Sequence, residues 1–541
     1  MRIVKNVFLT VLYTIMIIPC YGKESKTDYA ELVSLFKEFR VFVKPEIING
    51  VPDYTAGAMR KQYQELKIYR KRLVAIDTSG WSISLQVDYH IVRAEMNGLE
   101  FNHRILRPWS RDPGFYSIIP RFEQNMVGAI KIPQLPLSED KLEDFQGKLQ
   151  SIPKIFEQAK ENLTEAASDL VLLAVRRSER DSKRFQNFIE KLSGHHPNLV
   201  PDAKSALAAV DDFRAWLEHN RNKMTAPAGV GIDNYNWYLK NVQLVPYTWE
   251  EAMVIVRREY EQAMAILKLE KNRNRKIPAL KPEFSSQEYI QRFNDSQEFL
   301  LNFLKKEEIL SVPDYLVLLP LVSFKLPLQP YDFFQQCMIR DPLPLMPHDF
   351  VGHSLDAKRH ERDSRPIRGI EFHIYDRRYL FIDAFRNEGL ATGIEEILMQ
   401  AGLLDKRPRS REIICMLRIF RAVRAIADLK MHSNQISFKE AAEFCAERTP
   451  YGWCRADSDL IWGDLELYLC QPAYGIAYTM GKIQLEKLLA DRASQLGDKF
   501  SLRQFMDEFL AAGQIPISLT RWEMTGLEDE IRKITVTEQA P

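Results

Sequence analysis

The chain has 541 residues, of which 45% are hydrophobic and 27% are charged. It is therefore long enough for a large buried core and for two or three domains, and its composition excludes a disordered protein. Basic and acidic residues nearly cancel, leaving a formal net charge of +1, so no global field indicates nucleic acid or an anionic membrane as the partner.

The first residues are typical of an export signal. Two basic residues, Arg2 and Lys5, precede an apolar run over residues 7–18, and a cleavage pattern of small residues ends at Gly22. We therefore predict a signal peptide over residues 1–22 and a mature chain that is periplasmic or secreted.

Two alternatives at this end of the chain are less favoured. A lipoprotein would need Cys20 as its lipid acceptor, and Pro19 just before it fits that role poorly. An uncleaved anchor is disfavoured because the apolar run is shorter than the roughly 20 residues of a membrane span. We expect no stable membrane span after cleavage.

Cysteine usage leaves the redox state open. After cleavage five cysteines remain, an odd number that cannot all pair: Cys337, Cys415, Cys445, Cys454 and Cys470. Cys445 and Cys454 could close a short loop in an oxidising compartment, and buried free thiols are the equal alternative. No CxxC pair indicates a zinc knuckle or a redox dithiol.

Hydrophobic periodicity predicts a mainly α-helical protein with few short strands. From Thr27 apolar residues recur at intervals of three, beginning with Ala30, and this stripe is expected to face the core. Further helices are expected after Pro52 and over residues 84–99. The charged block 137–192 is expected to be helical with an interruption at Pro153.

The loop from Arg107 to Pro113 follows, and we interpret it as a connector in preference to a role in substrate access. Thr248, placed three residues before Glu251, predicts a capping box at the start of another helix. A basic run over 271–276 and the prolines after it favour a boundary between an N-terminal helical half, 23–280, and a C-terminal helical half, 281–541.

Half of the chain's ten histidines fall within about one sixth of its length: His348, His353, His360, His373 and His432. Two of them, His348 and His353, are five residues apart. On a regular helix this spacing turns their side chains about 140° from each other, so they could not share a metal without a local bulge. Gly352 stands where such a bulge costs least.

Glu388 would complete a set of two histidines and one carboxylate, the ligands of a catalytic zinc ion with one open position. Asp349, beside the first histidine, would be the general base. The structural alternative is that His348 and His353 pack at a helix end, and spacing alone weighs the two equally.

Downstream, Arg424, Asp428 and His432 are spaced by four residues on one helix face. A surface ladder of ion pairs is the default interpretation. The functional alternative is that Asp428 orients His432 toward a ligand or the substrate. Tyr478 could donate to a developing oxyanion or be an ordinary core residue.

From about Tyr89 to Gly526 the chain resembles the bacterial domain-of-unknown-function family 885, helical zinc peptidases of the gluzincin type. The similarity is distributed over several landmarks: Arg107 to Pro113, Glu388-Gly389-Leu390-Ala391, Arg424 to His432, Gln471-Pro472 with Tyr478 and Gly481-Lys482, and Phe505 to Pro516.

The resemblance also has departures. The family's HExxPGH motif corresponds here to HDFVGH once one residue is deleted, which places Asp349 at the position of the glutamate. This is similar to the HExxGH form of dipeptidyl peptidase III, whose two histidines are also five apart. Leu390 replaces the family's tryptophan, and Met506 replaces the histidine of its closing F-H.

The resemblance and the histidine cluster together predict an exported zinc-dependent peptidase that acts on a peptide substrate. In this prediction His348, His353 and Glu388 bind zinc, Asp349 activates water, and Tyr478 or His432 stabilises the oxyanion. The alternative is a catalytically impaired relative that binds a peptide or an envelope partner. Nothing in the sequence indicates the oligomeric state.

Overall fold

The computed structural model describes residues 26–119, 130, 132–316, 320–369 and 382–535. The predicted signal peptide lies outside these residues, as does His373. The mainly α-helical fold is confirmed, since the strands in the described ranges form one short hairpin, β1 (Ile47–Ile48) with β2 (Val51–Pro52). No helix among the described residues is long and apolar enough to cross a membrane.

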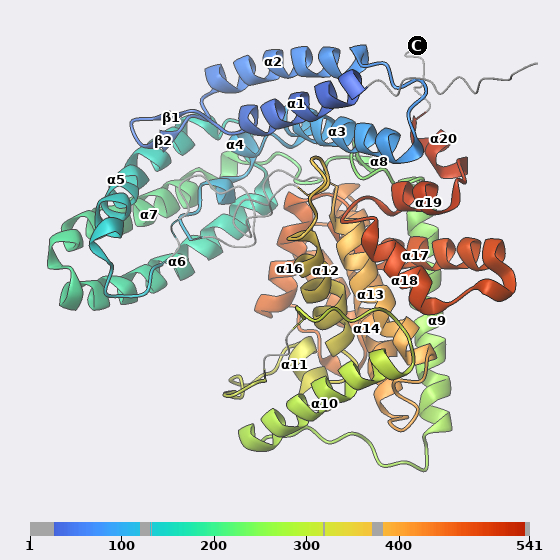
Figure 1. Ribbon diagram of the computed structural model, residues 1–541. Coiled ribbons are helices and arrows are strands. Elements are labelled where there is room, and N and C mark those ends of the chain that lie inside the picture. The colour runs from blue at the N-terminus through green and yellow to red at the C-terminus, as the bar shows by residue number, and fades with distance from the viewer. Residues whose placement is uncertain (1–25, 120–129, 131, 317–319, 370–381, 536–541) are drawn as a thin grey trace, which may run out of the picture.

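The N-terminal helices form a layer and a lobe (Figure 1). The layer consists of α1 (Lys26–Phe42), α2 (Ala56–Ala75) and α3 (Ile83–Phe101), and the lobe consists of α5 (Glu139–Asn162), α6 (Ser168–His195) and α7 (Val200–Asn220). Between them lie the π-helix η1 (Asn102–Leu106), the short helix α4 (Pro108–Arg111) and the 3-10 turn η2 (Pro113–Tyr116).

Two details of the predicted helices are wrong. Pro153 lies inside α5, and the break in the block falls instead between α5 and α6. A proline removes one backbone hydrogen bond, and the buried side chains of Ile152, Ile155 and Phe156 hold the helix together on both sides of it. Ala30 is exposed, because α1 buries the neighbouring face that carries Leu32 and Phe36.

The lower body in Figure 1 is built around α14 (Ser410–His432), whose residues are nearly all buried. The helices of this body are α9 (Trp249–Arg273), α10 (Ser286–Lys306), α11 (Phe333–Met338), α12 (Asp356–His360), α13 (Ala384–Gln400), α15 (Phe438–Arg448), α16 (Asp459–Cys470), α17 (Tyr474–Leu496) and α18 (Leu502–Ala511). The predicted capping box of Thr248 and Glu251 opens α9 and is confirmed. Short 3-10 turns connect other helices: η3 (Pro197–Leu199), η4 (Arg221–Lys223), η7 (Pro450–Gly452) and η8 (Gly497–Lys499).

The chain passes between the layer and the body more than once. Leu267 of α9 belongs to the same hydrophobic cluster as Phe420 of α14, although α9 precedes residue 280. The last helices, α19 (Ile517–Thr525) and α20 (Asp529–Thr535), return to the N-terminal layer, where Trp522 packs in one cluster with Leu66. Another helix, α8 (Ile232–Asn241), also contributes to a core with α14. The predicted division at residue 280 stays a prediction.

Candidate metal centre

The two histidines lie on a π-helix, η5 (His348–Leu355), which continues into α12. Backbone hydrogen bonds in a π-helix join residues five apart, so side chains at this spacing lie close to one turn from each other instead of diverging. Nε2 of His348 is 3.2 Å from Nε2 of His353. The predicted local bulge is confirmed.

Gly352 allows this π-helix to approach α13, the helix that carries the carboxylate. A Cβ atom added at Gly352 would lie 2.4 Å from Cα of Ala391, a distance that real Cβ atoms do not show. Ala391 is three residues after Glu388, so this close approach places Glu388 next to the histidines. Glycine is therefore required here for packing between the two helices.

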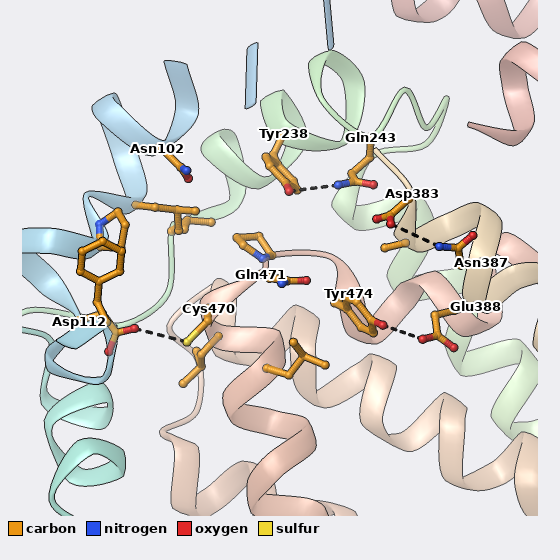
Figure 2. A pocket seen from close by; sticks show the side chains of 18 of the residues that line it. Asn102, Asp112, Tyr238, Gln243, Asp383, Asn387, Glu388, Cys470, Gln471 and Tyr474 are labelled. Carbon is orange, nitrogen blue, oxygen red and sulfur yellow. Dashed lines mark hydrogen bonds between the residues drawn. The ribbon is translucent and has the colours of Figure 1, made fainter. Parts of the chain in front are cut away.

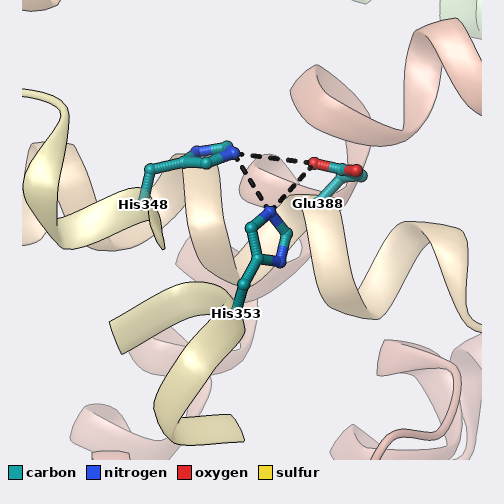
Figure 3. Close-up of side chains that lie close together, drawn as sticks. All are labelled: His348, His353 and Glu388. Atoms are coloured by element: carbon teal, nitrogen blue, oxygen red, sulfur yellow. Dashed lines mark hydrogen bonds and ion pairs between the residues drawn. The ribbon is translucent and has the colours of Figure 1, made fainter. Parts of the chain in front are cut away.

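Three side chains converge at this point, as Figure 3 shows. Oε2 of Glu388 is 3.8 Å from Nε2 of His348 and 3.8 Å from Nε2 of His353, and the candidate ligand atoms all lie within 4.8 Å of one another. Oε2 is buried and has no hydrogen-bond partner among the described residues. An orphaned carboxylate oxygen facing two imidazole nitrogens fits a zinc ion, which takes this donor set.

A buried ion pair orients the first histidine. Nδ1 of His348 is 3.1 Å from Oε1 of Glu395, and Arg421 donates to both oxygens of that carboxylate, at 2.6 and 2.7 Å. Burial raises the pKa of Glu395, but the charge of Arg421 together with hydrogen bonding to His348 and Arg421 outweighs burial, so the pKa is lowered overall. Nη2 of Arg421 also lies 3.1 Å from Nδ1 of His348. The Glu395–Arg421 pair therefore holds the Nδ1 side of the imidazole, and Nε2 of His348 is on the side of Glu388.

The second histidine is kept neutral by its surroundings. Burial lowers the pKa of His353, and this outweighs the nearby carboxylate of Glu388, which raises it. A neutral imidazole is the form that binds a metal ion.

Sequence reasoning missed Tyr474, the first residue of α17. Its hydroxyl donates to Oε1 of Glu388 at 2.6 Å, which leaves Oε2 to face the imidazoles. Helix α17 approaches α13 closely at Gly389 and Gly481, where an added Cβ atom on Gly389 would lie 2.6 Å from Cα of Gly481. The sequence gives little indication of a role for Tyr474, because a tyrosine at the start of a helix belongs to no known motif. The resemblance to the family instead indicated Tyr478.

The remaining predicted residues have different surroundings. Tyr478 is half-buried one turn after Tyr474, with its ring 5.0 Å from the Arg424 guanidinium and 5.9 Å from the ring of Tyr474. Asp349 is exposed on η5 and is not among the residues that line the cavity beside the histidines. Its role as a base stays a prediction.

The set on α14 is not a surface ladder. Arg424 is 2% exposed, whereas Asp428 and His432 are fully buried. Arg424 donates to Asp464 at 2.5 Å, so the default interpretation is wrong, because α14 lies in the centre of the body with neighbours on every side.

His432 is not brought to the two other histidines. Its Nε2 lies 2.9 Å from the carbonyl oxygen of Tyr468 and 3.4 Å from Oδ1 of Asp428, while Oδ2 of Asp428 accepts from the hydroxyl of Tyr235 at 3.0 Å. Burial lowers the pKa of His432 to about 4 and raises that of Asp428 to about 8. This buried cluster, Asp428, His432 and Tyr235, is separate from the candidate ligands.

A cavity of about 650 Å³ lies beside the candidate ligands and between the N-terminal elements and the body (Figure 2). His353, Glu388 and Tyr474 line one part of it, and residues of η1 and α4 line another. Pro108, Arg111 and Asp112 belong to the lining, so the loop from Arg107 to Pro113 forms a wall of the cavity in addition to connecting two helices.

The five cysteines among the described residues are free thiols. Cys470 lines the cavity, and its sulfur lies 3.6 Å from Oδ2 of Asp112. The other four are buried, and burial raises the pKa of Cys445 and Cys454. Of the two alternatives, the structure has the buried thiols.

The fold and the site define a class: a large α-helical protein with two histidines and one glutamate beside an internal cavity. The chain belongs to the family described as bacterial protein of unknown function (DUF885), whose sequence model matches residues 48–302 and 374–524. The match contains Glu388 and Tyr474. The segment between its two parts contains His348 and His353, so the variant motif lies outside the aligned regions.

Two solved structures share the fold. One is described as a "putative lipoprotein of unknown function" from Shewanella oneidensis; it has a TM-score of 0.69 and 13% identity, over 92% of this chain and 99% of that chain. The other is described as a "putative lipoprotein" from Colwellia psychrerythraea, with a TM-score of 0.66 and 15% identity, over 92% of this chain and 97% of that one. Comparison with curated protein sequences finds no match.

Proposed function

We propose that the protein is an exported zinc-dependent peptidase. The observation that carries this proposal is the convergence of His348, His353 and Glu388 around an orphaned carboxylate oxygen. A zinc ion held by these residues would polarise a carbonyl oxygen and acidify a bound water. The cavity of about 650 Å³ is within the range of ligand sites and offers room for a peptide segment.

The protein's own residues would perform the other steps. The carboxylate of Asp349 would accept the proton of the attacking water at Oδ and later deliver it to the leaving amine. Tyr478 would donate its hydroxyl proton in a hydrogen bond to the oxygen that becomes negatively charged. We leave His432 out of this mechanism, because it is fully buried and its Nε2 is engaged by the Tyr468 carbonyl.

An export signal over residues 1–22, as the sequence predicts, would direct this activity to the periplasm or outside the cell. The description of two proteins of the same fold as lipoproteins supports an envelope location.

A second candidate function is binding without turnover, to a peptide or an envelope partner. Asp349 favours it, because aspartate is one methylene shorter than the glutamate of the family motif and is exposed here. A displacement of about 1 Å can lower a rate on the order of 100-fold.

Elemental analysis of purified wild type and His353→Ala tests the metal centre. We expect close to one zinc per chain in wild type and none in the variant. Absence of zinc from wild type prepared without chelators would reject the peptidase proposal.

A fluorogenic peptide library separates the two candidates. We expect Asp349→Glu to raise kcat/KM by up to about 100-fold over wild type and Asp349→Asn to lower it. If wild type and both variants contain zinc and cleave no peptide, the result supports the binding function. If Asp349→Asn cleaves as fast as wild type, Asp349 is not the base.

A further inference from the structure

A second, smaller pocket lies beside α12, the helix that continues from the two histidines. It has a volume of about 320 Å³, and α12, the turn after it and the end of α18 line it. Gln514 belongs to the lining of this pocket and of the large cavity. Its amide donates to Oδ2 of Asp356 at 3.2 Å, so Gln514 and Asp356 lie where the two spaces are neighbours.

Arginines dominate the charge of this pocket. Arg359, Arg362 and Arg365 line it, against Asp356 and Asp363. Both acids are already paired: Asp363 accepts from Arg365 at 2.5 Å. Asp356 accepts at 3.1 and 3.3 Å from Arg386, which is fully buried and does not line the pocket. Once these pairs are set aside, Arg359 and Arg362 leave a positive charge on the pocket wall.

Two of the arginines retain donors. Arg359 uses one terminal nitrogen for the Ser311 carbonyl oxygen at 3.1 Å and lies 4.0 Å from Asp507, while its Nε is buried without a partner among the described residues. A guanidinium N–H without an acceptor is unfavourable, and an anion that reaches it would provide one.

Different contacts hold the side chain of Arg362 in place. Its Nη1 donates to the Lys358 carbonyl oxygen at 2.7 Å and lies 3.6 Å from Oε2 of Glu361. Its guanidinium lies 4.1 Å from the centre of the Tyr315 ring. Stacking on an aromatic ring holds the guanidinium plane, which favours planar two-point recognition of carboxylate or phosphate oxygens.

We propose that this pocket binds a small anion through carboxylate or phosphate oxygens, with Arg359 and Arg362 as the donors. The anion is either a free one or the terminal carboxylate of a peptide that extends from the large cavity past Gln514. The site does not depend on the metal centre or on peptide hydrolysis.

Isothermal titration at low ionic strength tests the site in full-length wild type and in His353→Ala, whose loss of zinc excludes anion binding to the metal. The probes are inorganic phosphate, an N-acetylated dipeptide with a free carboxylate, and the same dipeptide as its C-terminal amide. We expect saturable binding in the millimolar range for phosphate, for the free acid, or for both, and none for the amide. Binding of phosphate but not of the free-acid dipeptide would identify the ligand as a free anion. Binding of the free-acid dipeptide would identify it as a peptide terminus.

Arg359→Gln and Arg362→Gln are each expected to weaken binding at least tenfold. Arg532→Gln is the control, because Arg532 is 77% exposed on α20 and bonded to Glu528. Arg362 is half-exposed, so its variant is expected to melt as wild type does even if Arg359→Gln does not fold. Absence of saturable binding in wild type, or unchanged binding in both folded variants, would overturn the proposal.

Discussion

Two clusters of the molecule each combine histidine with a carboxylate and differ in what their atoms face. The candidate centre has His348, His353 and Glu388, and the buried cluster has His432, Asp428 and Tyr235. In the first, Oε2 of Glu388 faces two imidazole nitrogens at 3.8 Å beside a cavity. In the second, the Tyr468 carbonyl engages Nε2 of His432, and Asp428 accepts from Tyr235 and from the backbone N–H of Ile476.

Two properties therefore distinguish a binding site from a structural cluster: whether the side chains border a cavity, and which atoms already occupy the lone pairs of the nitrogen and oxygen atoms. A histidine whose Nε2 carries a hydrogen for a carbonyl oxygen cannot offer the same nitrogen to a metal ion. His348 has a different arrangement, because Glu395 and Arg421 lie against its Nδ1, whereas its Nε2 faces His353 and Glu388.

The largest expected effect comes from replacing one histidine of each cluster by alanine. His353→Ala is expected to remove all bound zinc and to change the melting temperature little, since the side chain is 39% exposed. His432→Ala is expected to keep zinc and to cost about 2 kcal/mol or more of unfolding free energy, because it leaves a cavity and an unpaired carbonyl in the core. Elemental analysis and urea unfolding of both variants check this; loss of zinc in His432→Ala would break the comparison.

The second prediction concerns the pH dependence of stability. Burial raises the pKa of Asp428 to about 8, above the value near 4 of an unfolded chain. Between pH 4 and pH 8 the folded protein therefore holds a proton on Asp428 that the unfolded chain has released. The contribution of Asp428 to the unfolding free energy falls as pH rises through this window, by up to about 1.4 kcal/mol per pH unit. Above pH 8 the contribution is constant.

Asp428→Asn cannot release a proton, so its unfolding free energy is expected to fall less steeply than that of wild type from pH 5 to pH 8. Asp459→Asn, at a residue whose side chain is 72% exposed, is the control and is expected to follow wild type. Urea unfolding at each pH measures the slopes. Parallel curves for wild type and Asp428→Asn would show that Asp428 is ionised in the folded protein.

The third prediction concerns the carboxylate behind His348. Glu395→Gln is expected to weaken zinc binding by about 10- to 100-fold, because it removes the carboxylate of the ion pair that orients His348. Glu396→Gln is the matched control on the same helix, since Glu396 pairs with Lys482 at 2.9 Å and with Arg418 at 3.3 Å. Competition with a chelator gives both affinities. Equal losses in the two variants would assign the effect to general destabilisation.

The smallest effect is expected from the tyrosine that holds Glu388. Tyr474→Phe removes one hydrogen bond of 2.6 Å to Oε1 and is expected to weaken zinc binding by about tenfold or less. Tyr478→Phe, one turn later on α17, is expected to leave zinc affinity unchanged. The same chelator competition measures both, and a larger loss for Tyr478→Phe would move the supporting role to that residue.

Local features of this protein followed from the sequence. The three-to-four-residue periodicity predicts the helices, the capping box of Thr248 and Glu251 predicts the start of α9, and the five-residue spacing of His348 and His353 predicts a bulge at Gly352. Each of these depends on residues within about one or two helical turns of one another, where backbone geometry alone determines which side chains are neighbours.

Only the tertiary structure decided the rest. The burial of Asp428 and His432 depends on helices packed around α14, and the partners of His348 and Glu388, namely Glu395, Arg421 and Tyr474, come from other positions of the chain. The cavity needs the loop from Arg107 to Pro113 against α13 and α17. These contacts join residues far apart in sequence, and the packing of whole helices, including the glycine approaches of Gly352 and Gly389, sets which of them meet.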